Sequence, residues 1–233
     1  MLPTTTSSAA ERSRLMYQRG PTVVFACRMD PRFCYCMYVP DSFDADPAGH
    51  ALIVAMHGTG RTMTAYRDGF AAFARFNKCV VLAPLFPVGP CGDDYADGFK
   101  YLQEADIRYD LVLLAMVAET GARLGMVFAQ FMLFGFSGGG HFAHRFFYLH
   151  PRHLMAVCIG APGAATLIDD SRDFWVGTRD LQARFGTALD LPAMRQVPVQ
   201  MVVGAADIET WEITYQPGSR NYMEGINDSG RTR

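Results

Sequence analysis

Long apolar runs are missing from this sequence of 233 residues. A helix that spans a bilayer needs roughly 20 apolar residues, and even the apolar stretch 111–117 is soon followed by Glu119 and Arg123. The first twenty residues are polar and lack the apolar centre, about 7–15 residues long, of a secretory signal. We therefore expect no membrane segment, a cytoplasmic location, and a disordered polar tail over residues 1–20.

An excess of charge of one sign is also missing. The 21 basic and 23 acidic side chains leave a net charge of -2, so no strong field would recruit nucleic acid or an acidic membrane. Among the six cysteines, Cys34 and Cys36 lie close together, but no second pair or histidine couple completes a zinc site. Cys158 lies in an apolar run, where small buried thiols are common. We expect reduced cysteines and neither a metal nor another cofactor.

Strand-like and helix-like patterns alternate along a chain whose apolar content, 50%, is sufficient for one core. This alternation predicts an α/β fold with a doubly wound, mostly parallel sheet, preceded by an N-terminal antiparallel hairpin. We expect a single domain over residues 21–233, with a short insertion at about 162–196. The expected segments are hairpin strands 23–27 and 33–39, buried strands 52–56, 80–83, 131–134, 155–159 and 199–203, and helices 64–77, 105–124 and 138–150.

The segment Gly135-Phe136-Ser137-Gly138-Gly139 fits the pattern G-x-S-x-G of a nucleophile elbow. In an elbow, a serine lies on a strained turn from strand to helix, with its hydroxyl exposed above the sheet. Glycine is needed at both ends of the pattern because side chains there would collide where the helix folds back on the strand. The preceding apolar run and the following helical pattern distinguish an elbow from a merely structural turn. Ser137 is therefore the candidate nucleophile.

A second motif, His57-Gly58-Thr59, ends the buried strand 52–56. A loop at this point can supply a backbone N–H to an oxyanion hole, which stabilises the negative charge that develops on a carbonyl oxygen. The predicted donors are the N–H groups of Thr59 and Gly138. His57 is either a catalytic base or a brace that holds the loop by hydrogen bonds. We favour the brace, because the expected chain order is serine, acid, then histidine.

Asp207 follows the apolar strand 199–203 and is the candidate acid of a triad. Such a carboxylate orients the imidazole and stabilises its protonated form. Glu209 is the neighbouring alternative, and Asp207 could instead cap a following helix. The loop-like segment 85–101, which is rich in proline, glycine and aspartate, is expected to lie near the site.

In order and spacing, these three motifs resemble those of α/β-hydrolase esterases over about residues 20–210. The resemblance implies a serine hydrolase that acts on the acyl bond of a small-molecule substrate through an acyl-serine intermediate, without a cofactor. In that family a further helix, a last strand and a loop with the catalytic histidine normally follow the acid. Here all six histidines precede Asp207, so we expect a C-terminally incomplete domain with impaired activity.

Other interpretations stay open. His141 lies four residues after Ser137, but its ring is expected to point along the helix beneath the elbow rather than toward the hydroxyl. One alternative is a hydrolase-fold binding protein, a pseudoenzyme that keeps the pocket without catalysis. Another is a fragment whose open sheet edge promotes aggregation.

Overall fold

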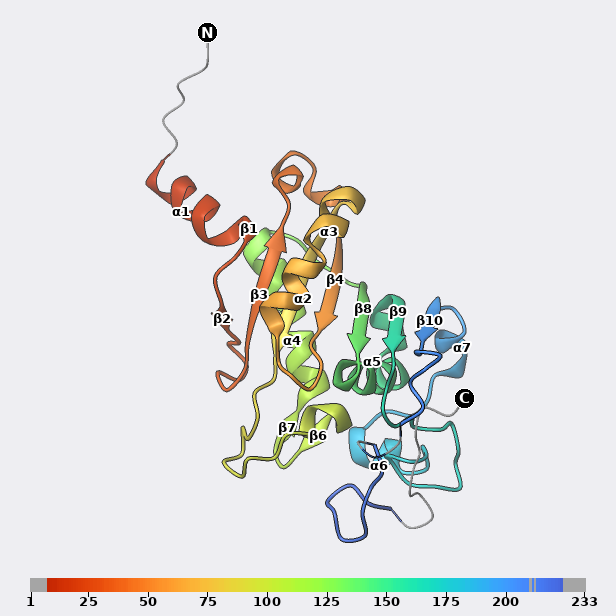
Figure 1. The fold of residues 1–233 in the computed structure, drawn as a ribbon. Helices are drawn as coiled ribbons and strands as arrows, with labels where there is room; N and C mark the ends of the chain where they lie inside the picture. The colour runs from red at the N-terminus through yellow and green to blue at the C-terminus, as the bar shows by residue number, and fades with distance from the viewer. Residues whose placement is uncertain (1–7, 210, 212, 224–233) are drawn as a thin grey trace.

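The computed structural model describes residues 8–209, 211 and 213–223. Within these residues, an eight-stranded sheet has the order β1-β3-β5-β4-β8-β9-β10, with β2 also paired to β3 (Figure 1). Neighbouring strands from β5 to β10 in this order are parallel, whereas β1, β2 and β5 pair with β3 in antiparallel fashion. The short strands β6 and β7 form a separate antiparallel pair. The predicted α/β fold with a mostly parallel sheet and an N-terminal hairpin is confirmed.

The strands are β1 Gly20–Pro21, β2 Phe25–Ala26, β3 Cys34–Val39, β4 Ala51–Met56, β5 Cys79–Leu85, β6 Gln103–Glu104, β7 Ile107–Arg108, β8 Phe131–Phe136, β9 Leu154–Gly160 and β10 Val199–Val202. The α-helices are α1 Ala9–Gln18, α2 Met63–Gly69, α3 Ala71–Asn77, α4 Tyr109–Leu124, α5 Gly138–Leu149, α6 Leu181–Phe185 and α7 Leu191–Met194. Four 3-10 turns are η1 Asp41–Ala45, η2 Pro47–Gly49, η3 Gly98–Tyr101 and η4 Pro151–His153.

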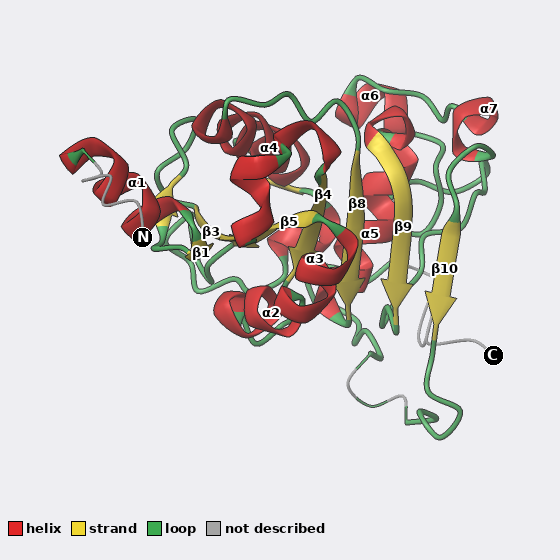
Figure 2. Cartoon of the chain, turned by 90° about the horizontal axis from the view of Figure 1, so that it is seen from above, coloured by secondary structure: helices red, strands yellow, loops and turns green. Residues whose placement is uncertain are grey.

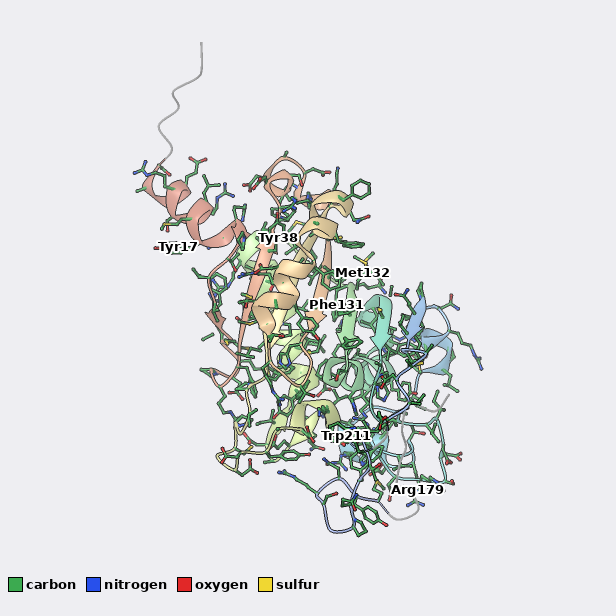
Figure 3. The ribbon with its side chains drawn as sticks, viewed as in Figure 1. Tyr17, Tyr38, Phe131, Met132, Arg179 and Trp211 are labelled. Atoms are coloured by element: carbon green, nitrogen blue, oxygen red, sulfur yellow. The ribbon has the colours of Figure 1, made fainter. Side chains whose placement is uncertain are left out.

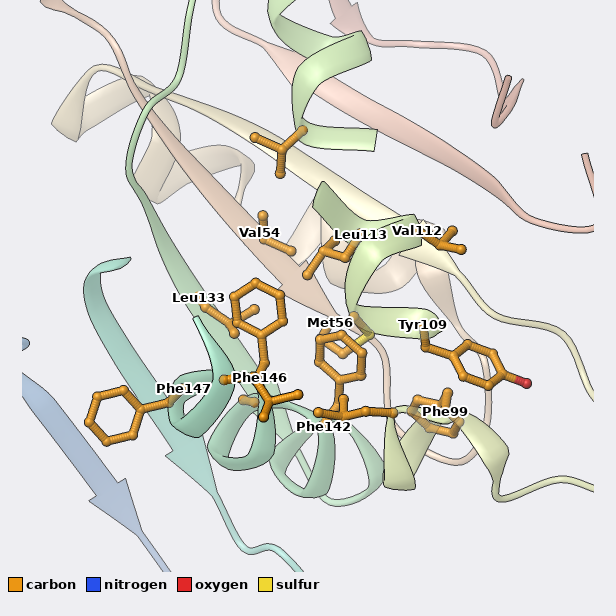
Figure 4. Close-up of a cluster of buried hydrophobic side chains, with 14 of the residues drawn as sticks. Val54, Met56, Phe99, Tyr109, Val112, Leu113, Leu133, Phe142, Phe146 and Phe147 are labelled. Carbon is orange, nitrogen blue, oxygen red and sulfur yellow. The ribbon is translucent and has the colours of Figure 1, made fainter. Parts of the chain in front are cut away.

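The sheet lies between two layers of helices (Figure 2). On one face, α4 and α5 enclose the main core, in which Val54 and Leu133 of the strands meet Leu113 and Phe146 of the helices (Figure 4). On the other face, α2 and α3 cover a smaller cluster over β3, β4 and β5. Apolar side chains therefore occur on both faces of the strands, which is why their sequences are continuous apolar runs.

The second face is covered only in part. Along β8, Phe131 is buried toward the main core, whereas Met132, its neighbour in Figure 3, is half-buried on the opposite face. Beyond α3, an apolar groove of about 440 Å³ runs over β8, β9 and β10, with Phe73, Phe134 and Val199 among its lining residues. All four residues of β10 are exposed. The end of the sheet at β10 is therefore open to solvent in the described part of the chain.

Three predicted boundaries differ from the structure. Residues 9–18 of the expected disordered tail form helix α1, which Ser8 caps by accepting a hydrogen bond from the Glu11 N–H at 3.1 Å. The single helix expected over 64–77 is two helices that meet at Phe70. The long helix begins at Tyr109 instead of residue 105, because the β6–β7 hairpin occupies the preceding residues.

No helix within the described ranges is both long and apolar enough to cross a membrane. All six cysteines are free thiols. The cytoplasmic location stays a prediction.

Candidate active site

Ser137 links the end of β8 to the start of α5 and adopts an unusual backbone conformation. Its φ of 55° and ψ of -118° lie outside the regions that L-residues normally occupy. The Ser137 N–H donates to the Gly160 carbonyl at 2.9 Å, and the Ser137 carbonyl accepts from the His141 N–H at 3.1 Å. The half-buried serine therefore lies at the carboxyl edge of the parallel strands, on the sharp strand-to-helix turn that the motif predicts.

The glycines on either side of Ser137 are needed for close packing. A Cβ built on Gly135 would lie 2.0 Å from the Gly139 carbonyl oxygen. A Cβ on Gly139 would lie 2.7 Å from the Met56 carbonyl oxygen and 2.8 Å from that of His57. Because these neighbours are backbone atoms, no rotamer change can relieve the clash. The first turn of α5 can thus pack against the ends of β4 and β8 only if both positions lack a side chain.

The loop after β4 lies directly against the elbow. A Cβ built on Gly138 would be 3.0 Å from the Thr59 nitrogen, and one on Gly58 would be 3.8 Å from the Ser137 Cβ. Among the described residues, neither the Thr59 N–H nor the Gly138 N–H donates a hydrogen bond. The Gly138 N–H is one of the unpaired donors at the start of a helix, where anions are stabilised. The structure therefore brings together Ser137 and the two predicted oxyanion donors.

His57 is buried behind this loop and bonded through both ring nitrogens. Its Nδ1 lies 2.8 Å from the Gly58 carbonyl oxygen, and its Nε2 accepts a hydrogen bond from the Phe86 N–H at 2.9 Å. Burial lowers the pKa of His57 to about 4, so the ring is neutral at pH 7. These bonds join the end of β4 to the end of β5, as expected of a brace for the loop rather than a base facing Ser137.

Asp207 lies in a turn shortly after β10. Its N–H donates to the Gly204 carbonyl at 3.1 Å, and the residue is half-buried, whereas Glu209 is exposed. In the described chain, neither acid is among the residues that line the pocket at Ser137. The structure therefore puts Asp207 beyond the carboxyl end of a parallel strand, as predicted, but does not bring it together with Ser137, Thr59 and Gly138 in one pocket.

The elbow opens into a pocket of about 280 Å³. Its lining residues include Ser137, Gly138 and Thr59. Asp97 and Tyr101, which also line it, come from the loop that was expected near the site. Further lining residues come from the segment 213–221, which the sequence did not single out because it has no apolar periodicity and no known motif. The hydroxyl groups of Tyr101 and Tyr215, 2.8 Å apart, join this segment to the loop.

The histidines near the elbow bond to the backbone. The His141 Nε2 accepts from the Gly163 N–H at 2.8 Å, and the His144 Nε2 accepts from the Thr166 N–H at 3.1 Å. In the part of the chain that is described, which contains all six histidines, none is hydrogen-bonded to the Ser137 hydroxyl. The geometry thus brings together a hydroxyl and two amide N–H groups, and His57, His141 and His144 each contact a backbone group through a ring nitrogen.

The Arg61 guanidinium donates to the backbone carbonyls of Thr59, Phe86 and Ala96. Arg61 thus joins the loop that carries Thr59 to the segment after β5. Across the residues with described positions, no group of three or more His, Cys, Asp or Glu could hold a metal ion.

No model of a known protein family matches the sequence, and no curated protein matches it. Several solved structures have a similar fold. A poly(3-hydroxybutyrate) depolymerase from Bordetella parapertussis matches over 92% of this chain and 76% of its own, with a TM-score of 0.66 and 23% identity. A poly(aspartic acid) hydrolase from Sphingomonas sp. KT-1 matches over 79% and 72%, with a TM-score of 0.63 and 19% identity.

An S-formylglutathione hydrolase from Agrobacterium tumefaciens is also similar, with a TM-score of 0.50 and 18% identity over 76% of this chain and 71% of the other. With identities this low, the likeness concerns the fold. The order of the sheet, the elbow and these three structures together show that the chain has the α/β-hydrolase fold.

Proposed function

We propose that this chain is a serine hydrolase that cleaves the carboxylic ester, or a related acyl bond, of a small molecule through an acyl-serine intermediate at Ser137. One observation carries the proposal. Ser137, with φ 55° at the end of β8, lies beside the N–H groups of Thr59 and Gly138, which donate to no other group of the described chain. A hydroxyl at a strained turn beside two unused amide donors is the arrangement that acyl transfer needs. The hydrolases of similar fold support the same class of reaction.

In this mechanism, the Ser137 oxygen attacks the carbonyl carbon of the ester while its proton passes to a base. The carbonyl electrons move onto the oxygen, and the resulting oxyanion accepts hydrogen bonds from the Thr59 and Gly138 N–H groups. Each such donor lowers the barrier by about 3 kcal/mol. When the oxyanion collapses, the alcohol leaves with a proton, and water then cleaves the acyl-serine by the same route. These steps require no cofactor.

The base is the one component that the described histidines do not supply to Ser137. Asp207 keeps its proposed role as the acid that would orient an imidazole, and a histidine that follows it in a longer chain stays a prediction. An oxyanion hole and substrate binding alone still accelerate acyl transfer by roughly a thousandfold over water. We therefore expect the 233-residue chain to turn over activated esters slowly, at a rate that remains measurable.

A fluorophosphonate probe tests the role of Ser137, because the N–H groups of Thr59 and Gly138 would stabilise the charge that develops on the phosphoryl oxygen when the Ser137 hydroxyl attacks. We expect labelling of the intact chain at Ser137 and slow hydrolysis of p-nitrophenyl acetate, with both lost in Ser137→Ala. Ser219→Ala is the matched control, since Ser219 lines the same pocket and should keep both signals. Unchanged hydrolysis by Ser137→Ala, or labelling of Ser219 instead, would refute the proposal.

The second candidate is a binding protein that keeps the pocket without catalysis. It is favoured by His57, His141 and His144, each of which contacts a backbone group of the described chain through a ring nitrogen. A folded protein that binds an acyl ligand in the 280 Å³ pocket, yet neither reacts with the fluorophosphonate nor hydrolyses esters, would establish this alternative.

A further inference from the structure

A second pocket adjoins the one at Ser137. Its volume is about 440 Å³, and it shares Tyr101 and Asn221 with the first pocket. Asn221 is held between the two pockets: its side-chain oxygen accepts from the Tyr95 hydroxyl at 3.0 Å, and its carbonyl accepts from the Trp175 Nε1 at 2.8 Å. A substrate that reacts at Ser137 and extends past Asn221 would therefore enter this second pocket.

Arg184 lines the second pocket, is exposed to solvent, and makes one side-chain hydrogen bond within the described chain, which leaves further N–H groups for a ligand. Its Nε donates to the Gln103 side-chain oxygen at 3.1 Å. Among residues with described positions, neither terminal nitrogen of Arg184 has a hydrogen-bond partner, and no carboxylate pairs with the guanidinium. A guanidinium with two unused N–H groups on one edge matches the geometry of a carboxylate.

A second arginine, Arg145, packs against Tyr101 and Trp175, two aromatic residues that line this pocket. Arg145 is fully buried, and its guanidinium lies 4.6 Å from the Tyr101 ring centroid and 5.5 Å from that of Trp175. It donates to the Thr166 hydroxyl at 2.9 Å and to backbone carbonyls, but no described carboxylate pairs with it. A buried charge without a counter-ion is costly, and its field acts strongly across a medium of low dielectric.

The remaining charges of the pocket largely compensate each other. Glu104 is buried; one of its oxygens accepts from the Tyr109 hydroxyl at 2.8 Å, and the other lies 3.8 Å from Arg220. Arg220 also pairs with Asp93 at 3.1 Å. Three arginines thus face two carboxylates, and Arg145 and Arg184 are the two without a partner of opposite charge in the described chain.

The same arginines make a cationic ligand a poor fit. Arg220 lies 3.9 Å from the Tyr95 ring centroid, Arg184 5.3 Å from that of Phe174, and Arg145 covers Tyr101 and Trp175. Each of these rings therefore already contacts a cation of the protein. The unused N–H groups of Arg184 can bind an anionic ligand, whereas the Glu104 Oε1, which has no hydrogen-bond partner among the described residues, is an acceptor in the same pocket.

We propose that the second pocket binds a carboxylate carried by the substrate, so that the esters taken at Ser137 are monoesters of dicarboxylic acids or similar acidic acyl compounds. The Arg184 guanidinium donates to the carboxylate, and Arg145 stabilises its charge from behind the Tyr101 and Trp175 rings. This inference rests on the proposed function for the position of the ester, but the binding of the carboxylate requires no catalysis.

Calorimetric titration with two matched esters tests the inference. Monomethyl adipate carries a carboxylate and an ester, whereas dimethyl adipate has the same chain without the charge. We expect the Ser137→Ala protein, which cannot turn over either ester, to bind the monomethyl ester roughly tenfold more tightly, as one charge-assisted contact allows. Adding Arg184→Gln should remove this preference, so that the two esters bind with equal affinity.

Arg179→Gln is the matched control, because Arg179 is an exposed arginine paired with Asp173 and is not among the lining residues of the second pocket. Equal affinity for the two esters, no binding of either ester, or a preference that survives Arg184→Gln would overturn the inference. If Ser137 instead fails to react with a fluorophosphonate while the preference for the monomethyl ester holds, the proposed hydrolase function fails and the carboxylate site stands.

Discussion

At the scale of single residues, His57 and His144 are neutral side chains whose two ring nitrogens both contact backbone groups. Burial lowers the pKa of His57 to about 4 and that of His144 to about 3, with smaller contributions from the charges of Arg61 and Arg145. In the unfolded chain, both rings regain a pKa of about 6.5. Folding therefore requires two imidazoles to remain unprotonated.

This requirement predicts a loss of stability in mild acid. Above pH 6.5 both rings are neutral in the folded and in the unfolded chain, so their protonation does not lower the free energy of unfolding. Below pH 6.5 the unfolded chain binds protons that the folded chain excludes, and this favours unfolding. By pH 5, each histidine should lower the free energy of unfolding by about 2 kcal/mol. Urea unfolding at pH 7, 6 and 5 measures the loss, and His144→Gln should roughly halve it. A midpoint that stays constant from pH 7 to pH 5 would contradict the assignment.

Much of the candidate site at this scale could be predicted from sequence. Ser137 and Thr59 follow two apolar runs, and β4 and β8 prove to be parallel neighbours, so their carboxyl ends meet. The role of Arg145 could not be predicted, because an arginine in a helix is normally exposed and its partners, Lys100 and Thr166, belong to distant loops. The sequence also could not place Asp207, which depends on the path of a turn after β10.

At the scale of elements, the contact between α5 and the strand ends of β4 and β8 shapes the site. The contact requires a side-chain-free helix surface at Gly139, which lies against the carbonyls of Met56 and His57. The sequence pattern predicted this packing correctly. It did not predict the break between α2 and α3 or the β6–β7 hairpin, because short polar segments carry weak periodic signals and depend on tertiary contacts.

Gly139→Ala tests the packing of α5. Its Cβ would be 2.7 Å from a backbone oxygen, so the helix must move, and we expect a loss of about 2 kcal/mol of unfolding free energy, with weaker fluorophosphonate labelling of Ser137. Gly69→Ala is the control: no atom lies within 4 Å of the added Cβ in helix α2, and alanine favours the helix by up to about 1 kcal/mol. Thermal unfolding compares the two variants, and equal stability would exclude a tight contact at Gly139.

At the scale of the whole molecule, the sheet is covered unevenly. One face is closed by α4 and α5, while beyond α3 the other face exposes an apolar groove that continues to the open strand β10. The order in which the strands pair, with β4 and β8 at the centre, could not be read from the sequence, because every buried strand has the same kind of apolar pattern. An open edge with apolar side chains favours association with other chains.

Met201→Lys should weaken such association. Met201 is 60% exposed on β10, and a lysine there opposes pairing of this edge with another chain while changing the free energy of unfolding by no more than about 0.5 kcal/mol. Light scattering over a range of protein concentrations should show a smaller rise in apparent mass for this variant. Val127→Lys, at another exposed apolar residue, controls for added charge. The same rise in mass for Met201→Lys as for the unmodified chain would exclude β10 as the contact.

Trp175, which lines the second pocket and donates to the Asn221 carbonyl, also has a spectroscopic consequence. The chain has two tryptophans, of which Trp211 is 76% exposed, whereas Trp175 is 5% exposed and its ring centroid lies 4.8 Å from that of Tyr215. Because a buried tryptophan fluoresces at shorter wavelengths than one in water, the short-wavelength part of the tryptophan fluorescence originates mainly from Trp175. The red-shifted part originates mainly from Trp211. Trp175 is thus an intrinsic fluorophore beside the second pocket, where the proposed elongated substrate would lie, and the exposed Trp211 serves as its internal standard.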